Sequence, residues 1–168
     1  MSQVSLHGQF GGQGADVFPE LLDIFDTYTT SRPILEHASA ILSAEAASPE
    51  AQALGLHPHG MDVIGWLREP SSRPPDLYLQ SAPVSFALTG LTQIAHYVVA
   101  LRCSGLSAEE MGGLLRGVRG HSQGLAMAVA VSSSLTTKAT IESAFQMLRF
   151  LFWQGTRCQQ VFDTVAAR

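Results

Sequence analysis

The pentapeptide at residues 120–124, Gly-His-Ser-Gln-Gly, has the residue types of a turn that carries a serine nucleophile. In this pattern the serine sits where a strand turns sharply into a helix, and the flanking glycines leave room for the backbone. Residues 116–121 form a candidate strand, and the small apolar segment 123–133 forms a candidate helix. A helix beginning at Gln123 would aim its backbone N–H at an oxyanion. This context favours Ser122 as a nucleophile.

A second interpretation of the same residues is purely structural. Ser122 would then cap the following helix, and the neighbouring glycines would serve only to permit a turn. His121 is adjacent to Ser122 in the chain, so its ring is badly placed to act as the base for that hydroxyl. We expect His121 to support the site or to face solvent. The pentapeptide by itself leaves both interpretations of Ser122 open.

The elements around the pentapeptide follow the order strand, several helices, strand, helix, helix. Four glycines within residues 8–14 predict a tight turn after a first strand at residues 4–9. Two strands with this much apolar helix predict an α/β fold. Because parallel strands normally lie inside larger sheets, we expect the chain to be part of a domain. Helices are predicted at residues 15–30, 33–47, 61–67, 82–105, 107–115, 123–133 and 137–164, with a loop at residues 48–60.

The longest predicted helices are the expected core. Residues 82–105 form the most apolar segment of the chain, and Gly105 ends it. The helix after it begins with a capping box, in which Ser107 and Glu110 satisfy each other's backbone N–H groups. The last helix is predicted to bury one face, formed by Ile141, Phe145, Leu148, Phe152 and Val161.

Composition narrows the class of protein. The chain has 168 residues, 46% of them apolar and 14% charged, and a net charge of −4, which argues against nucleic acid as a partner. It begins without the pattern of a secretory signal and has no run of about 18 uncharged apolar residues, so we expect a cytoplasmic protein. Cys103 and Cys158 are expected to be reduced, buried thiols. His57 and His59 lie in a Pro/Gly loop without cysteines, which argues against a metal site.

Two separated stretches together resemble the acyl-CoA:acyl-carrier-protein transacylases. They are residues 10–14, "FGGQG", and residues 120–131, "GHSQGLAMAVAV". The likeness is greatest to the N-terminal acetyltransferase domain of the fungal-type fatty acid synthase β subunit, followed by the starter-unit acyltransferase (SAT) domains of polyketide synthases. It continues through residues 78–99 and 148–160, in order along nearly the whole chain. The resemblance implies the N-terminal portion of the malonyl-CoA:ACP transacylase-like α/β fold, with Ser122 on a nucleophile elbow.

The resemblance implies a two-step acyl transfer in fatty acid or polyketide biosynthesis. Ser122 would take an acyl group from acyl-CoA, and the phosphopantetheine thiol of an acyl carrier protein would then collect it. Two backbone N–H groups form the oxyanion hole in the family, and they match Gln123 and Gln13. No bound cofactor is implied, because acyl-CoA is the substrate and phosphopantetheine is the acceptor.

Other polar residues also match marked positions of the family. His121 matches the histidine before the serine, and Gln93 and His96 match polar positions near the site. The alternative for Gln93 and His96 is that they are hydrogen-bonded polar groups on an apolar helix. Gln154 matches the position where malonyl-specific relatives carry an arginine for the malonyl carboxylate. A neutral residue there favours acetyl or another short uncharged acyl group.

The resemblance places the catalytic histidine in the second half of the domain, whereas all six histidines of this chain precede Ser122. We therefore expect residues 1–168 to be a partial acyltransferase domain that lacks the catalytic-histidine half. It would be a fragment of a synthase, one part of a split enzyme, or a remnant without catalysis. In isolation it should be weakly active or inactive and should expose apolar surface. Two other classes stay open, a non-catalytic scaffold or interaction module and a serine hydrolase.

Overall fold

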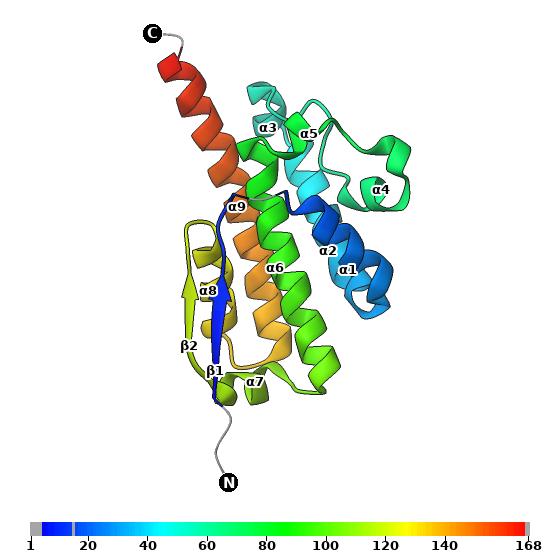
Figure 1. Ribbon diagram of the computed structural model, residues 1–168. Helices are drawn as coiled ribbons and strands as arrows, with labels where there is room; N and C mark the ends of the chain where they lie inside the picture. Colours follow the sequence, from blue (N-terminus) through cyan, green and yellow to red (C-terminus); the bar gives the residue numbers. More distant parts are fainter. Residues whose placement is uncertain (1–4, 15, 167–168) are drawn as a thin grey trace.

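A small parallel sheet lies against a bundle of helices. The computed structural model describes residues 5–14 and 16–166. Strand β1 (Leu6–Phe10) pairs in parallel with β2 (Leu115–Gly120), and α8 (Gly124–Ser132) packs against both strands (Figure 1). The predicted α/β class is confirmed at this level. The predicted first strand began at Val4, which lies outside the described residues.

Helix α6 (Ala82–Ser104) forms the centre of the molecule, with α9 (Thr137–Ala166) along one side (Figure 1). It ends as predicted, at Gly105 with a φ of 70°. Among the described residues, α6 is the one helix long and apolar enough to cross a membrane, which corrects the prediction that no such segment exists. Since 78% of its most apolar window is buried inside the protein, α6 is a core helix.

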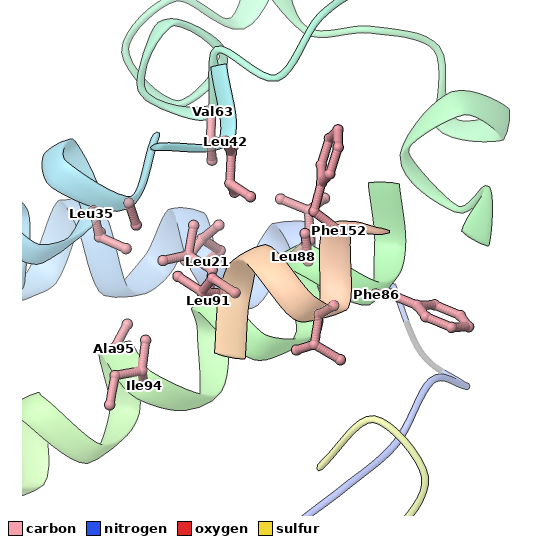
Figure 2. Packing of buried hydrophobic residues seen from close by; sticks show 14 of the residues in the cluster. Leu21, Leu35, Leu42, Val63, Phe86, Leu88, Leu91, Ile94, Ala95 and Phe152 are labelled. Atoms are coloured by element: carbon pink, nitrogen blue, oxygen red, sulfur yellow. The ribbon is translucent and has the colours of Figure 1, made fainter. Parts of the chain in front are cut away.

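Helices α1 (Phe18–Thr27) and α2 (Arg32–Ala46) cover the side of α6 away from the sheet (Figure 1). Their apolar faces meet those of α6 and α9 in one continuous core (Figure 2). Large side chains exposed by 2% or less at the centre of this core are Phe18, Leu21, Ile24, Leu35, Leu42, Leu88, Leu91, Ile94, Leu148 and Phe152.

The segment at residues 48–60 is not the loop that was predicted. Helix α3 (Pro49–Leu54) occupies part of it, because the Ser48 side chain accepts a hydrogen bond from the Ala51 N–H and Gly55 ends the helix in the left-handed conformation. The remaining short elements are α4 (Val63–Arg68), α5 (Asp76–Leu79), α7 (Ala108–Leu114) and the 3-10 turns η1 (Thr29–Ser31) and η2 (Pro70–Ser72). The capping box of Ser107 and Glu110 at the start of α7 is confirmed.

Two predictions of burial are wrong. Cys103 and Cys158 are free thiols at the surface, because the faces of α6 and α9 that carry them point away from the core. Val161 is 63% exposed, since α9 extends past the helices that cover its earlier turns (Figure 1). The prediction that the chain exposes apolar surface is supported by a set of large exposed side chains: Leu6, Tyr28, Leu77, Leu125, Val129, Leu135, Phe150, Val161 and Phe162.

Candidate active site

The carboxyl ends of the two strands bring together loops from distant parts of the chain. Phe10 lies opposite Gly120 in the register of the sheet, and the His121 N–H donates a 2.9 Å hydrogen bond to the Phe10 carbonyl. The loop after β1 and the turn after β2 therefore leave the sheet side by side. In open α/β folds this end of the sheet is where ligands bind.

Ser122 is held in an unusual backbone conformation. Its φ is +53°, and it is the only residue other than glycine with a positive φ in the part of the chain that the structure describes. For an L-amino acid this conformation costs about 1–3 kcal/mol and tends to mark functional sites. Helix α8 begins at Gly124, one residue later than predicted, so Gln123 becomes the residue before the helix.

The capping interpretation of Ser122 is not supported by this geometry. Its hydroxyl donates a 2.7 Å hydrogen bond to Oε1 of Gln123 and does not accept one from the first N–H groups of α8. The hydroxyl is solvent-exposed at the tip of the turn. An exposed serine on a strained turn is accessible to a substrate.

The glycines of the two loops allow this close approach. A Cβ on Gly120 would lie 2.4 Å from the backbone of Leu125, so no side chain fits between β2 and the first turn of α8. A Cβ on Gly12 would lie 2.8 Å from the Ser122 Cβ and 3.1 Å from Nδ1 of His121. Gly12 therefore lets the first loop pass against both residues. His121 itself is exposed beside this contact.

Gln13 is brought to Ser122 by this packing. The Gln13 backbone N–H donates a 3.0 Å hydrogen bond to Oε1 of Gln123, the same oxygen that the Ser122 hydroxyl contacts. The Gln13 side chain is fixed in turn, because its Nε2 donates a 2.8 Å hydrogen bond to Oγ of Ser85 on α6. Ser85 was not identified from the sequence. The signal that the sequence offered was a small polar residue within an apolar helix. A cavity of ≈ 380 Å³, lined partly by Gln13 and Ser85, adjoins the loop.

Gln93 and His96 lie one turn apart on α6 and have different surroundings. Nε2 of Gln93 donates a 2.6 Å hydrogen bond to the Gly11 carbonyl, so this side chain holds the first loop in place. Nε2 of His96 lies 2.7 Å from Oε1 of Glu20 on α1, and both side chains are about half exposed. The structure thus brings Gln93 to the loop and gives His96 a surface partner.

Gln154 lies on α9, next to a close contact with α6. Gly155 packs so tightly that a Cβ there would lie 2.1 Å from the Ala82 carbonyl. Oε1 of Gln154 is buried and has no hydrogen-bond partner among the described residues. The arginines on either side of it are engaged elsewhere, since Arg149 donates to Glu45 on α2 and Arg157 pairs with Glu50 on α3.

The histidines of the 57–59 segment are part of the packing. His57 is buried, its ring stacks 4.5 Å from the Phe152 ring, and its Nε2 lies 2.9 Å from Oγ1 of Thr156. Burial lowers the pKa of His57 to about 4, so the ring is neutral at pH 7. His59 makes an edge contact with Tyr78. Among the described residues, no group of three or more His, Cys, Asp or Glu side chains is placed to hold a metal ion.

Together these features define an α/β protein that carries a serine on a strained turn, met by a glutamine loop at the carboxyl ends of parallel strands. The chain belongs to the SAT family, described as "starter unit:ACP transacylase in aflatoxin biosynthesis", whose model matches residues 9–168. The family membership predicted from the sequence is confirmed.

Similar proteins include fungal fatty acid synthase β subunits. The chain is 39% identical over 166 residues to fatty acid synthase subunit beta of Schizosaccharomyces pombe, and 40% identical over 159 residues to fatty acid synthase beta subunit TOXC of Cochliobolus carbonum. It is 36% identical over 159 residues to fatty acid synthase subunit beta of Saccharomyces cerevisiae. These alignments cover 94–97% of this chain but only 8% of each relative, so the chain spans less than a tenth of their length.

Proposed function

We propose that this chain supplies the nucleophile half of an acyltransferase site that moves a short acyl group from acyl-CoA to an acyl carrier protein. The relatives are fatty acid synthase β subunits, and the family is one of starter-unit transacylases. The observation that carries the proposal is the meeting of Ser122, on its positive-φ turn, with the Gln13 N–H from the first loop. In this proposal Ser122 sits on a nucleophile elbow.

In the first step Oγ of Ser122 attacks the thioester carbonyl carbon. A C–O bond forms, the C–S bond breaks, and coenzyme A leaves as the thiol after taking up a proton. In the second step the phosphopantetheine thiol attacks the serine ester and restores the hydroxyl. The negative charge on the carbonyl oxygen in both steps would be stabilised by the backbone N–H groups of Gln123 and Gln13.

The proposal requires a general base that lies outside the described residues. Within residues 5–14 and 16–166, the Ser122 hydroxyl donates only to an amide oxygen, which cannot take up its proton at neutral pH. We therefore assign the base to another part of the assembled synthase, which acts in the cytoplasm in this proposal. Gln93, through Gly11, would keep the oxyanion loop in place. His121 would support the turn, and His96 would act only at longer range.

We assign acetyl, or another short uncharged acyl group, as the cargo. Gln154 offers a neutral amide at the position that the family resemblance assigns to acyl selection, and the neighbouring arginines are paired with glutamates. A malonyl carboxylate would therefore lack the charged fork that a buried carboxylate needs.

Intact-mass spectrometry of the chain after incubation with acetyl-CoA tests the proposal. An acetyl adduct that is absent from Ser122→Ala and weaker with malonyl-CoA would support it. No adduct on a folded chain, either alone or joined to the part of the synthase that supplies the base, would favour the non-catalytic scaffold. Free acetate produced without a carrier protein would favour the serine hydrolase. An acyl carrier protein added to the acylated chain should remove the adduct.

A further inference from the structure

The side-chain amide of Gln123 bridges the two groups that the proposed chemistry needs. Its Oε1 accepts a 2.7 Å hydrogen bond from the Ser122 hydroxyl and a 3.0 Å hydrogen bond from the Gln13 backbone N–H. The two donors come from positions 109 residues apart in the chain (122 − 13), and this one oxygen joins them. Gln123 is partly buried, so its amide lies between the turn and the first loop.

We infer that, in the free protein, the Gln123 amide oxygen occupies the position of the substrate's thioester carbonyl oxygen. This inference rests on the proposed function. When a thioester is attacked, its carbonyl oxygen lies within about 2.7–3.1 Å of the oxyanion donors as the oxyanion forms, and its carbonyl carbon lies next to Oγ of Ser122. An amide oxygen is a neutral carbonyl oxygen of similar size. It satisfies the same donor, the Gln13 N–H, and lies in contact with the same hydroxyl.

Two consequences follow for catalysis. Acyl-CoA must displace the Gln123 side chain before Ser122 can attack, so the side chain competes with substrate. The Ser122 hydroxyl proton is directed to an amide oxygen and is thereby kept from a base. Displacement of the Gln123 side chain frees the Gln13 backbone N–H, which can then join the Gln123 backbone N–H as an oxyanion donor. Gln123 is thus a positioning residue whose backbone and side chain have opposite effects.

Substitutions at residue 123 separate the two effects, because any residue but proline keeps the backbone N–H. Gln123→Leu retains the size of the side chain and removes the acceptor. We expect the apparent KM for acetyl-CoA to fall by about three- to tenfold, the size of one neutral hydrogen bond. Gln123→Glu keeps the acceptor and adds a charge where the oxyanion forms, so acylation should slow by about tenfold or more. Gln146→Leu, at an exposed position of α9, is the matched control.

The test has one readout that does not depend on activity. Solvent exchange of the Gln13 amide proton, measured by NMR without substrate, should become about three- to tenfold faster in Gln123→Leu and stay unchanged in Gln146→Leu. Acylation of Ser122 is then followed by intact mass over a range of acetyl-CoA concentrations. Gln123→Ala repeats both measurements in case the leucine variant does not fold.

The outcomes distinguish this inference from the proposed function. Faster Gln13 exchange together with a lower KM supports the inference. Unchanged Gln13 exchange, or a higher KM in both Gln123→Leu and Gln123→Ala, overturns it, because the side chain would then not bridge the two donors or would help substrate to bind. If no variant is acylated even when the chain is joined to the part of the synthase that supplies the base, the proposed function fails and the displacement step fails with it. The exchange rate of the Gln13 amide proton then shows only whether the Gln123 side chain bridges Ser122 and Gln13.

Discussion

Gly124 lies directly against the backbone of Phe10, so that a Cβ on Gly124 would be 2.3 Å from the Phe10 carbonyl oxygen. The last residue of β1 therefore passes the first residue of α8 with no space for a side chain. This contact joins the first loop to the serine turn. It explains why the residue two positions after Ser122 is glycine in this chain, in addition to any demand of the turn itself.

Substitution of Gly124 tests that contact. Gly124→Ala should lower the free energy of unfolding by about 2–3 kcal/mol, because backbone on both sides would have to move. Gly113→Ala is the matched control, since Gly113 lies in α7 with nothing within 4 Å of an added Cβ. It should raise stability by about 0.5–1 kcal/mol through helix propensity. Urea unfolding measures both, and equal effects would contradict the assigned contact.

The strained turn predicts that glycine at position 122 gives a more stable protein than alanine, although neither residue can carry the acyl group. Ser122 has a φ of +53°, which strains a residue with a Cβ. Glycine adopts this φ without strain, whereas alanine keeps the strain. After the entropic cost of glycine in the unfolded chain, we expect Ser122→Gly to be more stable than Ser122→Ala by about 0.5–1 kcal/mol. Both variants should lose the acetyl adduct. Thermal or urea unfolding of the pair provides the comparison, and an alanine variant at least as stable as glycine would argue against strain.

Gln93 should affect activity more than stability. Gln93→Leu removes the hydrogen bond to the Gly11 carbonyl and should cost about 1 kcal/mol of stability. Under the proposed function, acylation should slow by about tenfold or more, because the loop carries the proposed oxyanion donor and small displacements of such a donor are costly. Gln52→Leu removes a similar bond to the Ala46 carbonyl, away from the loops, and serves as control. Equal acylation rates in the two variants would show that Gln93 has no role in positioning the loop.

The buried His57 ring should lower the free energy of unfolding in mild acid. Oγ1 of Thr156 donates to the Phe152 carbonyl, so it accepts from Nε2–H of His57, and Nδ1 is buried without a partner among the described residues. Burial lowers the pKa of His57 from 6.5 to about 4. Between these two pH values, the unfolded chain therefore binds a proton that the folded chain does not. Stability from this group is fully present above about pH 6.5 and falls as the pH drops towards about 4. The total loss should be about 3 kcal/mol.

Urea unfolding at several pH values measures this effect. In His57→Leu the hydroxyl of Thr156 keeps its acceptor, so no new unpaired donor is created. The variant should have a shallower dependence of stability on pH between 6.5 and 4, whatever its stability at pH 7. An unchanged slope would assign the acid sensitivity to other groups.

Local patterns in the sequence determined most of the elements. The apolar run and Gly105 predicted the central helix α6, the Ser107–Glu110 pair predicted the cap of α7, and the glycines with Ser122 predicted the strand, turn and helix around the site. These features depend on contacts between residues close in the chain, which is why they can be read from it. The short helix α3 was missed, although Ser48 and Gly55 at its ends are ordinary helix boundary signals.

Tertiary structure decided what no local pattern carries. The exposure of Cys103 and Cys158 depends on which faces of α6 and α9 are covered by other helices. The hydrogen bonds of Gln93 to Gly11 and of Gln13 to Gln123 join positions 82 and 110 residues apart. The sequence by itself determined that a serine turn and a glutamine loop exist. Only the parallel pairing of β1 with β2 put their ends together, because a strand register sets which distant residues meet.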